Sequence, residues 1–172
     1  GSTMDAIACI DKMIDLKLAG HNIRVSNNSW GGSAHDPALE DAFKAAEGAG
    51  ILSMCAAGNE SENSDLEPLF PAALPLDGII SVVASDESDS KAGFSNYGEV
   101  STDLMAPGVN VLSLDTNGGY RTLNGTSMAT PHVSGVAAAM FGLNPSLTVA
   151  QAKNILLNPD SFDQTLFVQT ST

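Results

Sequence analysis

The sequence predicts an α/β fold in which helices cross between parallel strands of one sheet. Helix-like and strand-like segments alternate along the first half of the chain, as they do in proteins with parallel sheets. The candidate strands are continuous apolar runs, as expected for strands that are covered on both faces. A length of 172 residues and an apolar content of 43% suit one domain with a sizeable core.

Four segments in the first half of the chain carry clear end signals. Ser2 or Thr3 can cap the first helix, and Asp36 before Pro37 predicts the start of the second helix. The expected order is helix 2–19, strand 23–29, helix 37–49 and strand 51–57. This order favours parallel strands that are joined by crossover helices.

The second half of the chain is less regular in its middle and helical at its end. The expected order is strand 79–84, short extended pieces between 94 and 123, helix 127–142 and a last helix through Leu157. The sequence of the long helix is rich in Ala and Val, which predicts burial all round. Thr148 and Gln151 form a capping box for the last helix, which Asn158-Pro159 ends.

The charge of the chain excludes some partners. Twenty acidic and seven basic residues give a formal net charge of −13, whereas nucleic acids and anionic membranes attract a positively charged face. No apolar run approaches the length of a membrane span. Cys9 and Cys55 each lie in an apolar run, where a free cysteine acts as a small hydrophobe, and the sequence leaves a disulfide between them open.

The strongest chemical signal surrounds Ser127. A Gly-Thr turn places this serine in the first turn of the long helix. Free backbone N–H groups and the helix dipole favour developing negative charge there. A serine so placed can form an acyl-enzyme while its own N–H donates to the oxyanion. The residues by themselves also allow a plain helix cap.

Two further stretches carry polar or aromatic groups at strand ends. The sequence Ala56-Ala57-Gly58-Asn59 ends a buried strand and then presents an amide side chain. Such an Asn is by itself most simply a turn residue. The sequence Asn28-Ser29-Trp30-Gly31-Gly32 ends the first strand, and Trp30 suits core packing as well as a binding site.

The run GTSMATPHVSG over 125–135 resembles the serine signature of the subtilisin-like proteases throughout its length. Three other stretches of that family, FPA, FSNYG and MAPG, follow in the expected order at 70–72, 94–98 and 105–108. The resemblance covers the chain from Ser2 to about Leu157. It implies a three-layer, doubly wound parallel sheet of the subtilisin-like type that is incomplete at its N-terminal side. Residues 1–172 are accordingly expected to be the C-terminal portion of a peptidase catalytic domain.

The resemblance also implies a set of site residues for a serine endopeptidase. Ser127 would be the nucleophile, and the Asn59 side chain would hold the oxyanion together with the Ser127 N–H. The strand end at Ser29 would pair with the substrate backbone, which Gly31 and Gly32 would let approach closely. The residues implied to line the substrate cleft are Ser29, Trp30, Gly31, Gly32, Leu39, Ala56, Ala57, Gly58, Leu69 and Thr126.

Within this cleft the resemblance implies two pockets. Trp30 and Leu39 would form part of an apolar pocket several residues before the scissile bond. Ala56, Ala57 and Gly58 would wall the pocket for the residue just before the cut, with Leu69 at its base. No cofactor is required, and a structural calcium ion at Asp86 is the one metal site that relatives suggest.

The chain departs from the family in lacking its catalytic Asp and His motifs. Relatives carry Asp-Ser/Thr-Gly and His-Gly-Thr-His, and neither occurs here. His132 lies five residues after Ser127 on the same helix, so it points about 140° away. His21 is expected to be exposed, and His35 is the least unsuitable base. The chain alone is therefore expected to be inactive.

Three readings of the function follow. The first is an endopeptidase of peptides or proteins that needs the N-terminal portion of the same catalytic domain. The alternative is a non-catalytic subtilisin-like protein that binds peptides or acts as a scaffold. An unrelated α/β-hydrolase would need a late His, and His132 is the only one after Ser127. The family habit suggests secretion, and an incomplete sheet predicts that the chain by itself associates with itself.

Overall fold

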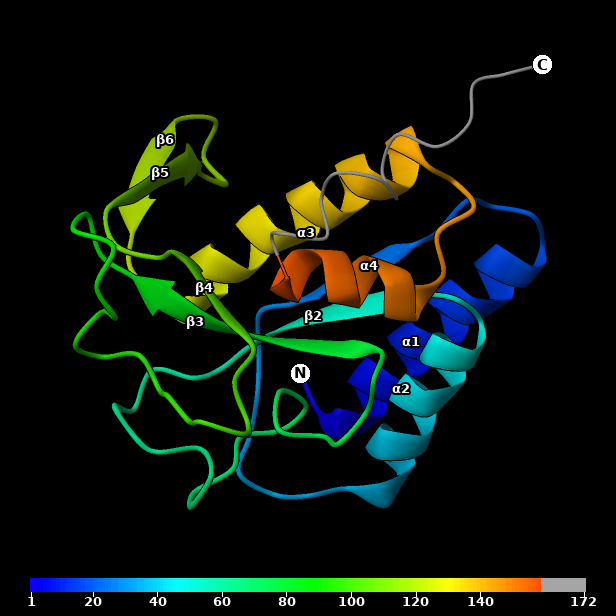
Figure 1. The fold of residues 1–172 in the computed structure, drawn as a ribbon, viewed down its shortest axis with the longest axis horizontal. Helices are drawn as coiled ribbons and strands as arrows, with labels where there is room; N and C mark the ends of the chain where they lie inside the picture. The colour runs from blue at the N-terminus through cyan, green and yellow to red at the C-terminus, as the bar shows by residue number, and fades with distance from the viewer. Residues whose placement is uncertain (159–172) are drawn as a thin grey trace.

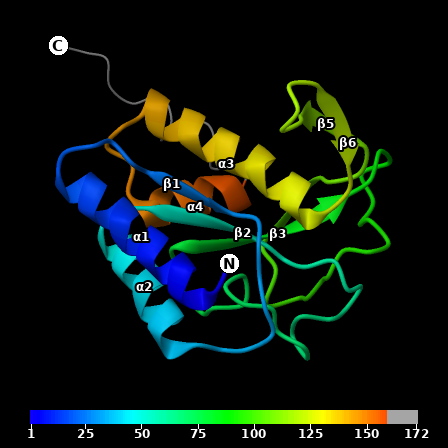
Figure 2. The same cartoon turned by 180° about the vertical axis from the view of Figure 1, so that it is seen from behind.

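A computed structural model describes residues 1–158 as three layers, in which helices cover both faces of a parallel sheet (Figure 1). The strands are paired in chain order: β1 (Val25–Asn28), β2 (Leu52–Ala56), β3 (Ile79–Ser85) and β4 (Leu104–Pro107). One face carries α1 (Thr3–Leu18) and α2 (Pro37–Gly48). The other carries α3 (Thr126–Leu143) and α4 (Val149–Leu157), and Figure 2 shows the layers from behind.

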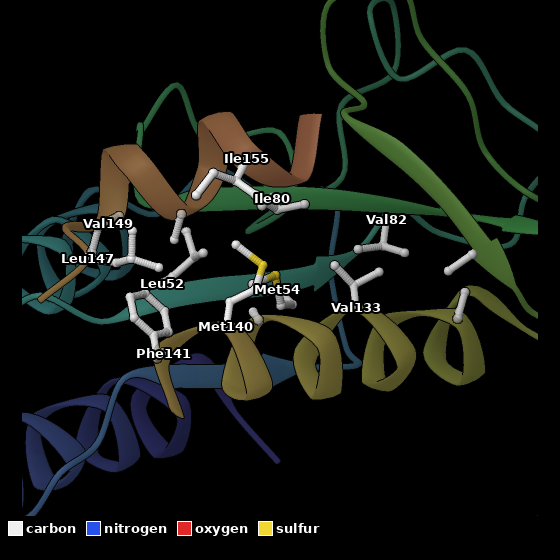
Figure 3. Packing of buried hydrophobic residues seen from close by; sticks show 14 of the residues in the cluster. Leu52, Met54, Ile80, Val82, Val133, Met140, Phe141, Leu147, Val149 and Ile155 are labelled. Carbon is white, nitrogen blue, oxygen red and sulfur yellow. The ribbon is translucent and has the colours of Figure 1, made fainter. Parts of the chain in front are cut away.

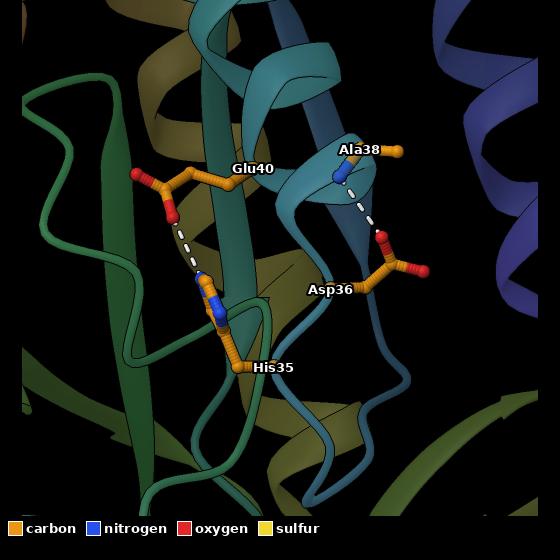
Figure 4. Close-up of polar contacts among 4 residues, drawn as sticks. All are labelled: His35, Asp36, Ala38 and Glu40. Carbon is orange, nitrogen blue, oxygen red and sulfur yellow. Dashed lines mark hydrogen bonds and ion pairs between the residues drawn. The ribbon is translucent and has the colours of Figure 1, made fainter.

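The helix ends follow the capping residues. The Ser2 side chain accepts from the Asp5 N–H, and the Asp5 carboxylate accepts from the Ser2 N–H. Asp36 caps α2 through the Ala38 N–H (Figure 4), and Thr148 forms the expected capping box with Gln151. These local predictions are confirmed.

Two apolar cores hold the layers together. Between the sheet and α3 and α4, residues such as Met54, Ile80 and Met140 interdigitate (Figure 3). Between the sheet and α1 and α2, the core contains Ile10, Phe43 and Cys55. Burial raises the pKa of the Cys55 thiol, which keeps it a neutral hydrophobe. Cys9 is exposed, and both cysteines are free thiols.

The long helix α3 differs from the expectation of burial all round. Its inner face, with Ala129, Val133 and Ala137, packs against all four strands of the sheet. On its outer face Val136 is 48% exposed and Leu143 is 67% exposed. The prediction was wrong because composition reports how apolar a helix is and not how many layers cover it.

The irregular middle of the chain contains two features that the sequence pattern did not define. One is β4, which completes the described sheet. The other is an exposed antiparallel hairpin of β5 (Val111–Leu114) and β6 (Tyr120–Leu123). The hairpin stands apart from the layers in Figure 1 and leads directly into α3. The short extended pieces expected between 94 and 123 are thus confirmed.

Candidate active site

Ser127 is the second residue of α3 and lies where the carboxyl end of β1 meets the start of this helix. Its Oγ donates a hydrogen bond of 3.3 Å to the Ser29 carbonyl oxygen, and the Ser29 Oγ donates one of 2.9 Å to the Ser127 carbonyl oxygen. No described residue accepts a hydrogen bond from the Ser127 N–H. The site therefore offers a half-buried hydroxyl and an open N–H donor side by side.

The Asn59 side chain is oriented by its oxygen. Asn59 Oδ1 accepts from the Thr126 N–H at 2.8 Å and from the Thr126 Oγ1 at 3.1 Å. With its oxygen engaged, the amide must turn Nδ2 the other way, and no described residue accepts from that nitrogen. Asn59 is exposed, so Nδ2 is an open donor at the surface.

Gly125 lies next to both donor residues and has an unusual backbone conformation. Its φ of +151° is a backbone conformation that side chains rarely adopt. A Cβ at this position would lie 3.6 Å from Asn59 Oδ1 and 3.7 Å from the Ser127 nitrogen. The glycine is thus adjacent to both the Asn59 amide and the Ser127 N–H, and its positive φ would strain a residue with a side chain.

Thr126 supports the site from within. Its side chain is fully buried, and its Oγ1 also accepts from the Gly58 N–H at 3.3 Å. The hydroxyl thus ties the strand end at Gly58 to the start of α3. The buried Thr126 hydroxyl thus helps to orient Asn59, and its predicted contact with substrate stays a prediction.

Asn96 is a supporting residue that sequence reasoning missed. Its Oδ1 accepts from the N–H groups of Glu60 and Glu62, and its Nδ2 donates to the Ala57 carbonyl and to Glu60 Oε2. The same Glu60 oxygen accepts from the Asn59 N–H at 2.8 Å. Asn96 therefore holds the loop that carries Asn59. Its signal was the FSNYG run at 94–98, where this Asn stands between two strands.

The residues expected around the pocket for the residue just before the cut lie close to one another. Ala56, Ala57 and Gly58 are buried at the end of β2. A Cβ on Gly58 would come within 2.9 Å of a Leu69 methyl carbon, and one on Gly31 within 2.7 Å of the same atom. Leu69 thus lies between Gly31 and Gly58, and its place at the base of a pocket stays a prediction.

The two glycines after Trp30 differ in what surrounds them, and their predicted role in substrate binding stays a prediction. Gly31 is needed because Leu69 and the Phe70 carbonyl approach it, and Gly32 pairs its backbone with that of Phe70. A Cβ on Gly32 would meet nothing within 4 Å. The close approach at Gly31 is thus made by the protein's own chain.

A groove of about 860 Å³ runs from α1 along the edge strand β1 to the loop after it. Trp30, Gly31, Gly32 and Leu39 line it, together with the first turns of α1. Trp30 is 38% exposed and also packs against Phe43, with ring centroids 6.3 Å apart. Trp30 therefore both packs against the core and lines the groove. Ser127 and Asn59 lie outside the groove lining.

No described histidine forms a hydrogen bond with Ser127. The His35 Nε2 lies 2.7 Å from Glu40 Oε2 (Figure 4), and its ring packs edge-on against Phe70. His132 bonds the Met128 carbonyl within its own helix, and His21 is exposed. Among residues 1–158, the Ser127 hydroxyl has no His, Asp or Glu as a hydrogen-bond partner.

Asp86 closes a turn. Its Oδ1 accepts from the Ser88 N–H, the Ser88 hydroxyl and the Ser90 N–H. These bonds lower the pKa of the Asp86 carboxyl, with the Ser88 hydroxyl as the largest cause. The described residues contain no group of three or more His, Cys, Asp or Glu side chains that could hold a metal.

A half-buried hydroxyl at a helix start, beside two N–H donors without a described acceptor, is an arrangement that can hold an oxyanion next to a nucleophile. Comparisons with known proteins show the family to which the chain belongs. The profile of the subtilase family matches residues 1–167. Subtilisin-like protease 3 of Arthroderma otae is 42% identical over 153 residues, which cover 88% of this chain and 37% of that protein. Subtilisin BL of Lederbergia lenta is 40% identical over 144 residues, covering 83% and 51%.

Solved structures show the same fold. A cold adapted subtilisin-like serine proteinase superposes with a TM-score of 0.81 at 38% identity, over 91% of this chain and 54% of that chain. The chain therefore belongs to the subtilase family, and the predicted fold class is confirmed. It spans between about a third and a half of the length of the curated relatives. Among the described helices, none is long and apolar enough to cross a membrane.

Proposed function

We propose that this chain carries the nucleophile and the oxyanion hole of a subtilisin-type serine endopeptidase. The observation that carries the proposal is the pair of open donors beside Ser127: the N–H of Ser127 itself and the Asn59 Nδ2, which the two Thr126 bonds orient. Donors that are fixed before the reaction stabilise an oxyanion without reorganisation.

In the proposed reaction, the Ser127 Oγ attacks the peptide carbonyl carbon and transfers its proton to a base. The carbonyl oxygen becomes an oxyanion between the Ser127 N–H and the Asn59 Nδ2. The tetrahedral species collapses, the amine leaves with the proton, and Ser127 keeps the acyl group as an ester. Water then attacks the ester by the same route and restores the hydroxyl. No cofactor takes part.

The base and its orienting carboxylate would come from a further polypeptide segment of the subtilase catalytic domain. Two observations support this. No described histidine bonds Ser127, and the relatives are about two to three times as long as their matched parts. The groove lined by Trp30 and Leu39 supports a preference for substrates with apolar side chains before the cut. Secretion, which is common among members of the family, supports an extracellular site of action.

A fluorophosphonate probe tests the proposal, because it reacts with an activated serine. We expect no labelling of the chain alone, and labelling of Ser127 once a segment with the Asp and His stretches of a subtilase is joined to it. Ser127→Ala should abolish the signal. Ser113→Ala, in the exposed strand β5, is the matched control and should leave it intact.

The second candidate is a non-catalytic peptide-binding or scaffold protein, which the absence of a described base at Ser127 favours. It predicts that Ser127 stays unlabelled even in the joined form, while peptides bind equally well to the chain and to Ser127→Ala. Labelling of the chain by itself would contradict both candidates, because it would require a base within these residues.

A further inference from the structure

Pro131 leaves the carbonyl of the nucleophile without its normal partner. In an α-helix the carbonyl of residue 127 accepts from the N–H of residue 131, and α3 has proline there. The Ser127 carbonyl therefore needs a donor from outside the helix.

Ser29 supplies this donor. Its Oγ lies 2.9 Å from the Ser127 carbonyl oxygen, although the two residues are 98 positions apart. We propose that Ser29 is a positioning residue for Ser127, whose hydroxyl donates the hydrogen bond that Pro131 cannot and so fixes the first turn of α3. The inference rests on the proposed function for its catalytic consequence.

Two further side chains set the direction of the Ser29 hydroxyl. The Asn27 Nδ2 donates to the Ser29 Oγ at 2.9 Å, and the Ser134 Oγ donates to the Asn27 Oδ1 at 2.9 Å. Because Ser29 Oγ already accepts from Asn27, its own hydrogen is available for Ser127. Asn27, in β1, and Ser29, just after this strand, thus both form hydrogen bonds with α3.

The consequence concerns the Ser127 N–H. The peptide before it donates through the Thr126 N–H to Asn59 Oδ1, and the peptide after it accepts from Ser29 through the Ser127 carbonyl. The peptide that carries the oxyanion donor is thus flanked by two peptides that are held from outside the helix. Without the hydrogen bond from the Ser29 hydroxyl, the peptide that carries the Ser127 N–H should be free to rotate. The Ser29 carbonyl should remain in place.

The structural test uses the full chain. Labelling with carbonyl-¹³C serine and ¹⁵N methionine selects two residue pairs, Ser53-Met54 and Ser127-Met128. Ser29→Ala should shift the Ser127 carbonyl resonance and leave that of Ser53, the internal control. Ser29→Thr should leave both in place. In Pro131→Ala the new N–H can pair with Ser127, so Ser29→Ala should have little effect in that background. An unmoved Ser127 resonance in Ser29→Ala would overturn the inference.

The catalytic test uses the joined form. Ser29→Ala should lower kcat for a peptide substrate about tenfold with little change in KM, since misplacement of a reacting group costs rate and not binding. Ser29→Thr should restore it. Ser113→Ala removes an exposed hydroxyl of β5, far along the chain from this network, and it should have no effect. Full activity in Ser29→Ala would overturn the inference and leave the proposed function standing. A joined form without activity would refute the proposed function, and the carbonyl resonance would still decide the role of Ser29.

Discussion

At the scale of single residues, the site depends on which atom of the Asn59 amide already forms hydrogen bonds within the protein. Asn59 could present either its oxygen or its nitrogen to a reaction. The two bonds from Thr126 occupy the oxygen, and they leave the nitrogen as the donor. An aspartate would have no such donor.

We expect Asn59→Ala to lower kcat of the joined form by about 10²–10³ with a small change in KM, as loss of the corresponding donor does in subtilisin. Kinetics on a peptide substrate measure this. Asn117→Ala, in the exposed hairpin turn, is the control. Equal kcat values for Asn59→Ala and the control would show that the amide does not bind the oxyanion.

At the scale of elements, one carboxylate ties two loops together. The Asp65 carboxylate accepts from the N–H groups of Glu99, Val100 and Ser101 and from the Ser101 hydroxyl. These bonds lower the pKa of Asp65, with the Ser101 hydroxyl as the largest cause. The loop before β4 is thereby fastened to the loop that follows Asn59.

This carboxylate predicts a pH dependence. Because its pKa is lower in the folded chain, the stability that it contributes is present above the ordinary carboxyl range and is lost as the pH falls below about 4. Asp65→Asn should therefore lower Tm at pH 7, and the difference from the original chain should shrink at pH 3. Asp41→Asn, an exposed α2 carboxylate to which no described residue donates, is the control. An equal Tm difference at both pH values would contradict the prediction.

At the scale of the whole molecule, one open strand edge and one apolar helix face are exposed. Strand β1 is one edge of the described sheet, and a groove runs beside it. The outer face of α3, with Val136 and Leu143, is exposed and apolar. Open strand edges and apolar faces favour association between chains.

We therefore expect the chain by itself to sediment as a concentration-dependent oligomer. Val136→Glu places a charge on the outer face of α3 and should shift the distribution toward monomer. Val100→Glu, at an exposed valine outside the helices, is the control. A monodisperse monomer for the original chain across the concentration range would contradict the prediction.

The sequence by itself determined where the capped helices of this protein begin. Capping at Ser2, Asp36 and Thr148 depends on residues within three positions, so spacing along the chain predicts it. The serine motif at 125–135 likewise identified the family, because the residue types themselves carry the resemblance.

Only the tertiary structure decided which residues from different elements contact one another. Asn59 meets Thr126 across 67 positions, and Ser29 meets Ser127 across 98. Such pairs depend on the register of β1 and β2 and on how α3 lies across the sheet. The exposed outer face of α3 has the same origin, since burial depends on the layers around a helix and not on its composition. A sequence pattern reports neighbours along the chain, and packing selects neighbours in space.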